Sequence, residues 1–193
     1  VQLRVNGIIP HPISLDDYFI NRKDTPVDEF GKHDFESINA LDTKQFNEDL
    51  TKLIAGETVQ LPTYNFITGS REYKGKYMHL KKGEIMVIEG IHGLNDVLTE
   101  SILPENKFKI FISAMTELNI DDHNIVSTAD SRLIRRIVRD YQFRGNSAAA
   151  TIESWHKVRQ GEEKNIFPYQ ENADIIFNSA TVYELSVLKA FIV

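Results

Sequence analysis

The chain has 193 residues, 41% of them hydrophobic and 26% charged, a composition that is ordinary for a globular protein and excludes a disordered or fibrous one. It contains no cysteine, which excludes disulfide frameworks, thiolate metal sites and thiol nucleophiles. The net charge of −6 disfavours nucleic-acid binding, and no apolar run approaches the roughly 20 residues of a membrane span. With no signal-peptide pattern at its start, the chain is expected to be cytoplasmic.

The beginning of the chain alternates between helical and extended patterns. Residues 1–7 are expected to be the end of a helix that Gly7 closes, and residues 10–14 a strand that runs into acidic residues. Apolar residues at helical spacing predict a helix over 41–55, which Gly56 ends.

Two extended segments, 58–66 and 71–80, predict a β-hairpin. Tyr64 and Phe66 lie in its first half and are suited to stacking against a planar ring. Aromatic residues in a hairpin more often pack across the strands, so this alternative stays open.

Three short apolar runs are typical of strands that are buried on both faces, and hence of a parallel sheet; they occupy residues 85–89, 108–113 and 174–178. Helical patterns follow at 128–143, 147–161 and 182–191, the first with Ser127 and Asp130 at capping-box positions. No repeat or linker divides the sequence. We therefore expect a single α/β domain over 1–193 with a doubly wound parallel sheet.

Acidic residues stand at the ends of two predicted strands. Asp16 and Asp17 follow the strand at 10–14, and Glu89 ends the strand at 85–89. Ligands of open α/β sheets gather at the carboxyl ends of strands, where a carboxylate can accept a proton from a substrate hydroxyl or hold Mg²⁺. Taken singly, each acid is more simply a solvated loop residue or a helix cap, but two such acids in one sheet favour a site.

One predicted helix carries arginines on a single face, at positions i, i+3, i+4 and i+7: Arg132, Arg135, Arg136 and Arg139. Residues 110–156 contain no lysine, and Arg144-Gly145 breaks the helix. Arginine without lysine suggests bidentate binding of phosphate, so we expect a hinged helical flap over a polyphosphate. The alternative is a helix that is salt-bridged to neighbouring acids.

The histidines show no metal-ligand spacing. His92 and His123 are expected to be polar loop residues rather than zinc ligands.

Six motifs occur in a fixed order along nearly the whole chain: ISLDDYF, DFES, LPTYNF, VIEGIHGLN, DSRLIRRIVRD with a following RG, and PYQENAD. In this order they resemble the phosphoribulokinase/uridine kinase family, most closely its bacterial uridine-kinase-like members. Members are P-loop kinases that transfer the γ-phosphoryl group of ATP to a hydroxyl of a nucleoside or sugar phosphate. The resemblance implies a P-loop-kinase-like α/β fold, ATP and Mg²⁺ as cofactors, and a small-molecule nucleoside or sugar substrate.

The resemblance also implies roles for particular residues. Asp16 matches the catalytic base, and Glu89 matches the acid that acts on Mg²⁺ or its water shell. The substrate-binding residues are then Asp17, Glu36, Tyr64 and Phe66, within a substrate hairpin over 58–80. A lid over 128–163 carries the arginines that would close on the phosphates, here called the lid arginines: Arg132, Arg135, Arg136, Arg139 and Arg144.

Some family features are absent from these residues or altered. The phosphate-binding motif GxxxxGK[ST] does not occur, and we expect it to precede residue 1, as we expect further helical segments to follow residue 193. Ile125 stands where related bacterial sequences have arginine, and Glu36 stands where uridine kinases carry a ribose-binding aspartate.

We therefore expect the core of a uridine- or cytidine-type kinase, truncated at both ends and with little or no activity alone. The alternatives are a kinase for a sugar phosphate or pantothenate-like acceptor, and a non-catalytic module that binds a nucleotide or nucleoside. Open sheet edges would favour a homo-oligomer.

Overall fold

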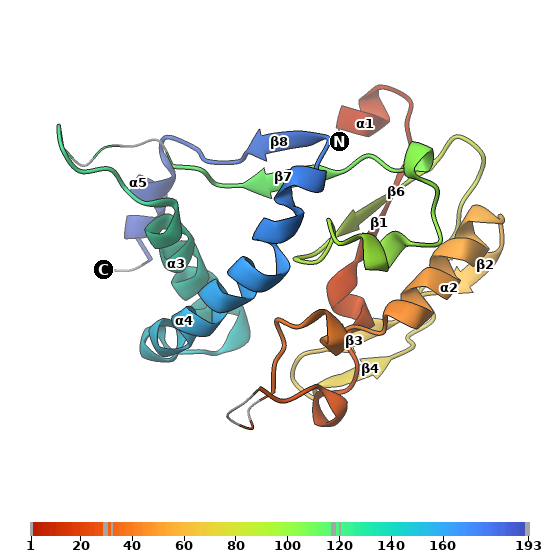
Figure 1. Cartoon of the computed structure of the whole chain (residues 1–193), viewed down its shortest axis with the longest axis horizontal. Helices are drawn as coiled ribbons and strands as arrows, with labels where there is room; N and C mark the ends of the chain where they lie inside the picture. The colour runs from red at the N-terminus through yellow and green to blue at the C-terminus, as the bar shows by residue number, and fades with distance from the viewer. Residues whose placement is uncertain (1, 29–30, 32, 117–118, 120, 192–193) are drawn as a thin grey trace. The chain divides into compact units, whose positions relative to one another are not determined.

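The computed structural model describes residues 2–28, 31, 33–116, 119 and 121–191. Its contacts divide the chain into two compact units. The first comprises Val1–Lys107 with Asn165–Tyr169, and the second comprises Phe108–Lys164 with Gln170–Val193. Figure 1 shows the order of the elements along the chain.

The first unit is built on a parallel pair of strands. Helix α1 (Gln2–Val5) ends before Gly7, whose φ of 77° provides the predicted left-handed turn. Strand β1 (Pro10–Ser14) pairs with β6 (Ile85–Glu89) in parallel. Both strands were predicted from their apolar runs, and their register places Ser14 opposite Glu89.

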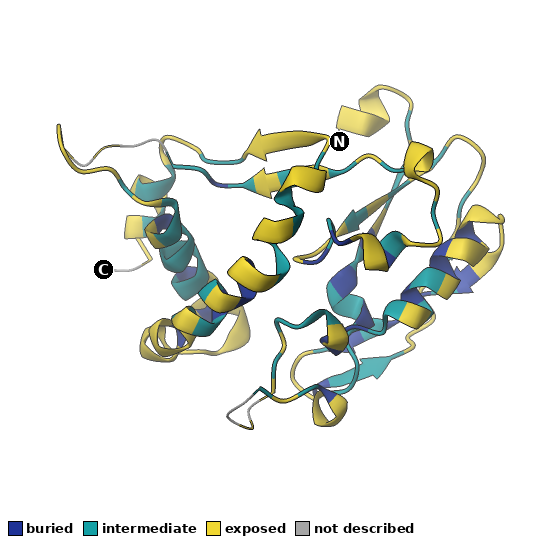
Figure 2. Ribbon diagram, viewed as in Figure 1, coloured by how far each residue is buried: buried dark blue, intermediate teal, exposed yellow. Residues whose placement is uncertain are grey.

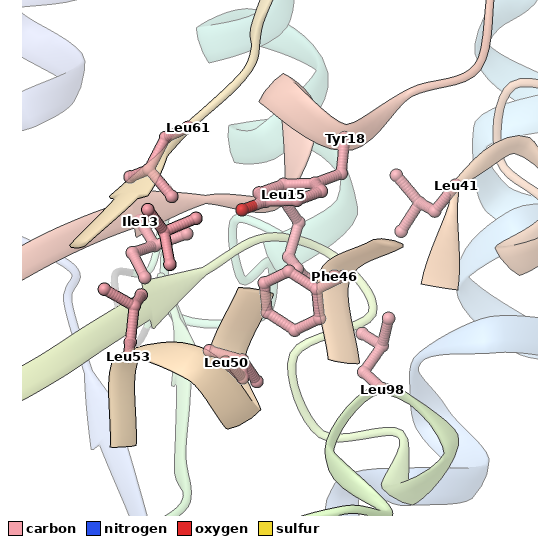
Figure 3. Packing of buried hydrophobic residues seen from close by; sticks show 10 residues of the cluster. Ile13, Leu15, Tyr18, Leu41, Phe46, Leu50, Leu53, Leu61 and Leu98 are labelled. Carbon is pink, nitrogen blue, oxygen red and sulfur yellow. The ribbon is translucent and has the colours of Figure 1, made fainter. Parts of the chain in front are cut away.

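Helix α2 (Thr43–Ile54) packs its apolar stripe against these strands. It begins where Asp42 accepts a hydrogen bond from the backbone N–H of Gln45 (3.0 Å), and it ends before Gly56, as predicted. Figure 3 shows the resulting core, whose buried members include Ile13, Leu15, Tyr18, Leu41, Phe46, Leu50, Leu53, Leu61 and Leu98. Burial of each large side chain contributes about 1.5–3 kcal/mol, so this cluster is the main source of stability in the unit.

The predicted hairpin is present as two antiparallel ladders. Strand β2 (Thr58–Gln60) pairs with β5 (Tyr77–His79), and β3 (Thr63–Asn65) pairs with β4 (Ser70–Glu72). Short 3₁₀ turns at Leu15–Tyr18, Arg22–Asp24, Ile38–Ala40, Asp96–Thr99 and Pro104–Asn106 connect the longer elements.

The second unit combines a parallel strand pair with helices. Strand β7 (Ile110–Ser113) pairs with β8 (Ile175–Asn178), and the helices are α3 (Thr128–Arg139), α4 (Ala148–Asn165) and α5 (Glu184–Lys189). The Ser127 hydroxyl caps α3 by accepting from the backbone N–H of Asp130 (3.0 Å), as its position predicted. A π-helical turn, Asp140–Arg144, continues α3 and ends at Gly145, whose φ of 69° breaks the helix.

One expectation about the strands is wrong. The apolar runs predicted strands buried on both faces, but Ile112 in β7 and all of β8 are exposed (Figure 2). Within the described residues β1, β6, β7 and β8 pair only in twos, so each strand has one edge without a neighbouring strand. None of the described helices is long and apolar enough to cross a membrane.

Candidate active site

The acidic residues predicted at two strand ends lie at one edge of the β1–β6 pair. Ser14 ends β1 directly opposite Glu89, and its hydroxyl donates a hydrogen bond to the Glu89 carboxylate. The 3₁₀ turn Leu15–Tyr18, here called the acidic turn, follows at once and carries Asp16 and Asp17. Parallel pairing thus places Glu89 beside Ser14, the residue that leads into the acidic turn, although the two are 75 positions apart in sequence.

The loop after Glu89 passes very close to the acidic turn. Gly90 has a φ of 153°, and a Cβ at this position would lie 2.7 Å from Cβ of Leu15. Glycine is therefore required sterically where the two strand ends meet.

Asp17 connects the acidic turn to the hairpin. One carboxylate oxygen accepts from the backbone N–H of Tyr64 (3.2 Å), and the other accepts from Nζ of Lys76 (3.4 Å). The two contacts hold β3 beside the turn. In this structure Asp17 therefore positions the hairpin, and direct contact of Asp17 with substrate stays a prediction.

A buried polar network supports the acidic turn from α2. The Tyr18 hydroxyl donates to Asp49 (3.0 Å), which also accepts from the side-chain amide of Gln45 (2.8 Å). Both Tyr18 and Asp49 are buried. Burial, and then the Asp49 charge, raise the pKa of Tyr18 far above its usual value, so the phenol stays protonated as a hydrogen-bond donor.

Three aromatic rings line the hairpin beside the acidic turn. The ring centre of Tyr64 is 5.6 Å from that of Phe19 and 5.1 Å from that of Phe66. Tyr64 is buried, whereas Phe66 is 52% exposed. The packing alternative therefore holds for Tyr64, while Phe66 leaves ring surface for a ligand.

Glu36 lies beside the loop that follows β6. Its backbone N–H donates to Asp34 (3.1 Å), and its carbonyl accepts from the side-chain amide of Asn165 (2.8 Å). The fully buried His92 lies in the loop after Glu89, three residues beyond it. Burial lowers the pKa of His92, and the Glu36 backbone and the Asp34 charge oppose this shift.

His92 was correctly placed in a loop by the sequence, but its burial was missed. His92 lies between Gly90 and Gly93, and this position in a glycine-flanked loop could have indicated its burial.

In the second unit, the lid arginines are ion-paired. Arg132 pairs with Glu162, which also accepts from Arg159 (2.7 Å), and Arg135 pairs with Glu184. Glu162 is buried. The salt-bridged alternative therefore describes these contacts, and phosphate binding by the lid arginines stays a prediction.

The Asp140 carboxylate forms ion pairs with the other three lid arginines. Its side chain is 4% exposed and lies 3.3 Å from Arg136, 3.3 Å from Arg139 and 3.5 Å from Arg144. Three guanidinium groups thus share one carboxylate. Partly exposed guanidinium groups suit an anionic ligand, because their paired donors match the oxygens of a phosphate.

Two hollows are present among the described residues, and neither Asp16 nor Glu89 lines them. One, of about 490 Å³, runs along α2 and is lined by Thr43, Asn47, Thr51 and Glu100. The other, of about 140 Å³, lies in the second unit and is lined by Met115, Ser131, Asn178 and Thr181. Asn178 ends β8 and accepts from the backbone N–H of Met115 (3.0 Å), so this hollow is at the carboxyl ends of β7 and β8. The sequence analysis did not single out its residues.

One carboxylate of the first unit, that of Glu89, could take part in holding Mg²⁺. The described residues contain no group of three or more acidic or histidine side chains that could hold a metal ion. Mg²⁺ is usually held by only one or two carboxylates together with substrate phosphates, and Glu89 supplies a carboxylate of this kind.

Comparison with known proteins adds independent information. A family model described as phosphoribulokinase / uridine kinase family matches residues 13–186. The uridine kinase of Proteus mirabilis is 30% identical over 171 residues, which cover 88% of this chain and 70% of that protein. The uridine kinase of Ligilactobacillus salivarius is 30% identical over 162 residues, which cover 83% of this chain and 68% of that protein.

Two solved structures show the fold. A putative fructose transport system kinase from Silicibacter has a TM-score of 0.57 at 16% identity, covering 91% of this chain and 78% of that one. A possible uridine kinase from Bacillus stearothermophilus has a TM-score of 0.52 at 18% identity, and the match covers 92% of this chain and 76% of that one. The chain has a P-loop-kinase-like α/β fold, as its sequence predicted.

Proposed function

The chain belongs to the phosphoribulokinase/uridine kinase family, and from this premise we propose that it forms the core of a nucleoside kinase. The proposed reaction transfers the γ-phosphoryl group of ATP to a ribose hydroxyl of a uridine- or cytidine-type nucleoside. One observation carries the proposal: the acidic turn, the Glu89 carboxylate and the aromatic hairpin meet at the carboxyl end of the β1–β6 pair.

Asp16 is proposed as the general base. As the hydroxyl oxygen of the acceptor forms its bond to the γ-phosphorus, the bond from that phosphorus to the bridging oxygen of ADP breaks, and Asp16 accepts the hydroxyl proton. The neighbouring Asp17 holds the hairpin beside the acidic turn by accepting a hydrogen bond from the backbone N–H of Tyr64. Phe66 offers its exposed ring to the base of the nucleoside.

Glu89 is proposed to hold Mg²⁺ or its water shell, and the Ser14 hydroxyl orients this carboxylate. The ion would neutralise negative charge on the phosphates. In the second unit, the three arginines around Asp140 are proposed to bind phosphate oxygens, with the guanidinium groups exchanging part of their carboxylate contacts for them.

These 193 residues alone are proposed to bind a nucleoside but to turn over little ATP. The GxxxxGK[ST] motif, which supplies backbone N–H groups and a lysine to the β- and γ-phosphates, does not occur within them. The same observation favours a second candidate, a module that binds nucleosides without catalysis.

Calorimetric titration of the chain with uridine, cytidine and ribose 5-phosphate tests the proposal. Saturable binding of a pyrimidine nucleoside in preference to ribose 5-phosphate is expected. Preference for ribose 5-phosphate would instead support a sugar-phosphate acceptor, and no binding of any of the three would refute a nucleoside site. A coupled assay for ADP release separates the two candidates when a GxxxxGK[ST] segment is fused ahead of residue 1: turnover supports the kinase, and no turnover supports the module.

A further inference from the structure

Arg22 holds the turn of the hairpin that carries the aromatic residues. It opens the short 3₁₀ turn Arg22–Asp24, four residues beyond the acidic turn. Its backbone N–H donates to the carbonyl of Gly69 (2.8 Å), and its Nη2 donates to the carbonyl of Phe66 (2.7 Å). The guanidinium group is therefore fixed at the backbone of Phe66, whose side chain is exposed.

Gly69 makes room for this side chain. A Cβ at Gly69 would lie 2.8 Å from both Cβ and Nε of Arg22 and 2.9 Å from its Cζ. The φ of Gly69 is +68°, which also disfavours a side chain. Any larger residue here would displace the guanidinium group, so the placement of Arg22 depends on this glycine.

The positive charge of Arg22 affects the neighbouring Tyr64. Burial raises the pKa of the Tyr64 hydroxyl, and the positive charge of Arg22 partly opposes that rise. Arg22 is an exposed residue. A guanidinium group has five N–H donors, and within the described residues Nη2 is the side-chain atom engaged in a hydrogen bond. Donors thus remain beside the backbone of Phe66, whose side chain is exposed.

We propose that Arg22 is a specificity-determining residue of the acceptor site, where it donates hydrogen bonds to a carbonyl oxygen of a planar heterocycle that packs on Phe66. The inference rests on the proposed nucleoside kinase function. A ring carbonyl fits better than a phosphate for two reasons: the donors lie at the backbone of an aromatic residue whose side chain is exposed, and Asp16 and Asp17 of the acidic turn, which ends four residues before Arg22, disfavour a second anionic group.

Calorimetric titration with uridine tests this role. Arg22→Met is expected to weaken uridine binding at least tenfold, and Arg22→Lys, which keeps the charge but not the planar fork, is expected to weaken it less. Lys23→Met removes an adjacent exposed charge and is the matched control, with unchanged affinity expected. Thermal unfolding of each variant shows whether it is folded. If Arg22→Met does not fold, Arg22→Lys still tests the role of Arg22.

A double-mutant cycle separates a role of Arg22 in uridine binding from an effect on the stability of the fold. Gly69→Ala should weaken uridine binding in the parent chain, by displacing Arg22, but have little further effect in the Arg22→Met background. Equal uridine affinity of the parent and Arg22→Met would refute the role of Arg22 while leaving the nucleoside site intact. Selective loss of ribose 5-phosphate binding instead would also refute it. Failure of the parent chain to bind any nucleoside would refute the proposed function itself.

Discussion

Replacement of Asp17 by alanine should loosen the hairpin from the acidic turn. The hydrogen bond from the backbone N–H of Tyr64 to this carboxylate is charge-assisted and contributes about 1.5–3 kcal/mol. The ion pair with Lys76, whose side chain is 47% exposed, adds no more than about 1 kcal/mol. We expect Asp17→Ala to lower the free energy of unfolding by about 2–3 kcal/mol and to weaken uridine binding.

Asp17→Asn separates the two contacts. An asparagine side-chain oxygen still accepts from Tyr64, but as a neutral acceptor, so this variant should lose the ion pair and the charge-assisted part of the hydrogen bond, about 1–2 kcal/mol together. Lys76→Met removes the ion pair alone and should lower the free energy of unfolding by less than about 1 kcal/mol. Urea unfolding followed by circular dichroism measures the three losses. Equal losses for Asp17→Asn and Asp17→Ala, or none for Asp17→Ala, would refute this account of the hairpin.

Two further predictions concern buried titratable groups. Burial lowers the pKa of His92, so its contribution to stability is present above the unfolded value of about 6.5 and is lost as pH falls, by up to about 1.4 kcal/mol per pH unit. The melting temperature of the parent chain should therefore fall below pH 6.5 more steeply than that of His92→Phe, and parallel profiles would contradict this. Asp140→Asn should lower the free energy of unfolding by about 1–3 kcal/mol, less than for a fully buried pair because its arginines are partly exposed. Scanning calorimetry measures this loss, and unchanged or increased stability would show that the carboxylate does not hold the cluster together.

The features that depend on local pattern were predictable from the sequence. The acids at the strand ends are an example, because β1 and β6 follow from apolar runs and the carboxyl ends of parallel strands share one edge. The cap of α3 at Ser127 and the break at Gly145 follow likewise from residue type and position.

The partners of charged side chains were not predictable, since they depend on contacts that no local pattern encodes. Asp17 contacts Tyr64 from 47 positions away in sequence, and Arg135 contacts Glu184 from 49 positions away. The sequence showed an arginine face but not the buried carboxylates that it meets. Arg22 carried no signal of its own, because its placement follows from the missing side chain at Gly69.

The central claim is that the acidic turn and the hairpin form an acceptor site, and a crystal structure of the chain with uridine tests it most directly. The account predicts the pyrimidine ring against Phe66 and a ribose hydroxyl within about 3.2 Å of the Asp16 carboxylate, the reach of a general base. Uridine bound elsewhere, for example in the hollow along α2, with Asp16 out of hydrogen-bond reach of every ribose hydroxyl, would contradict it.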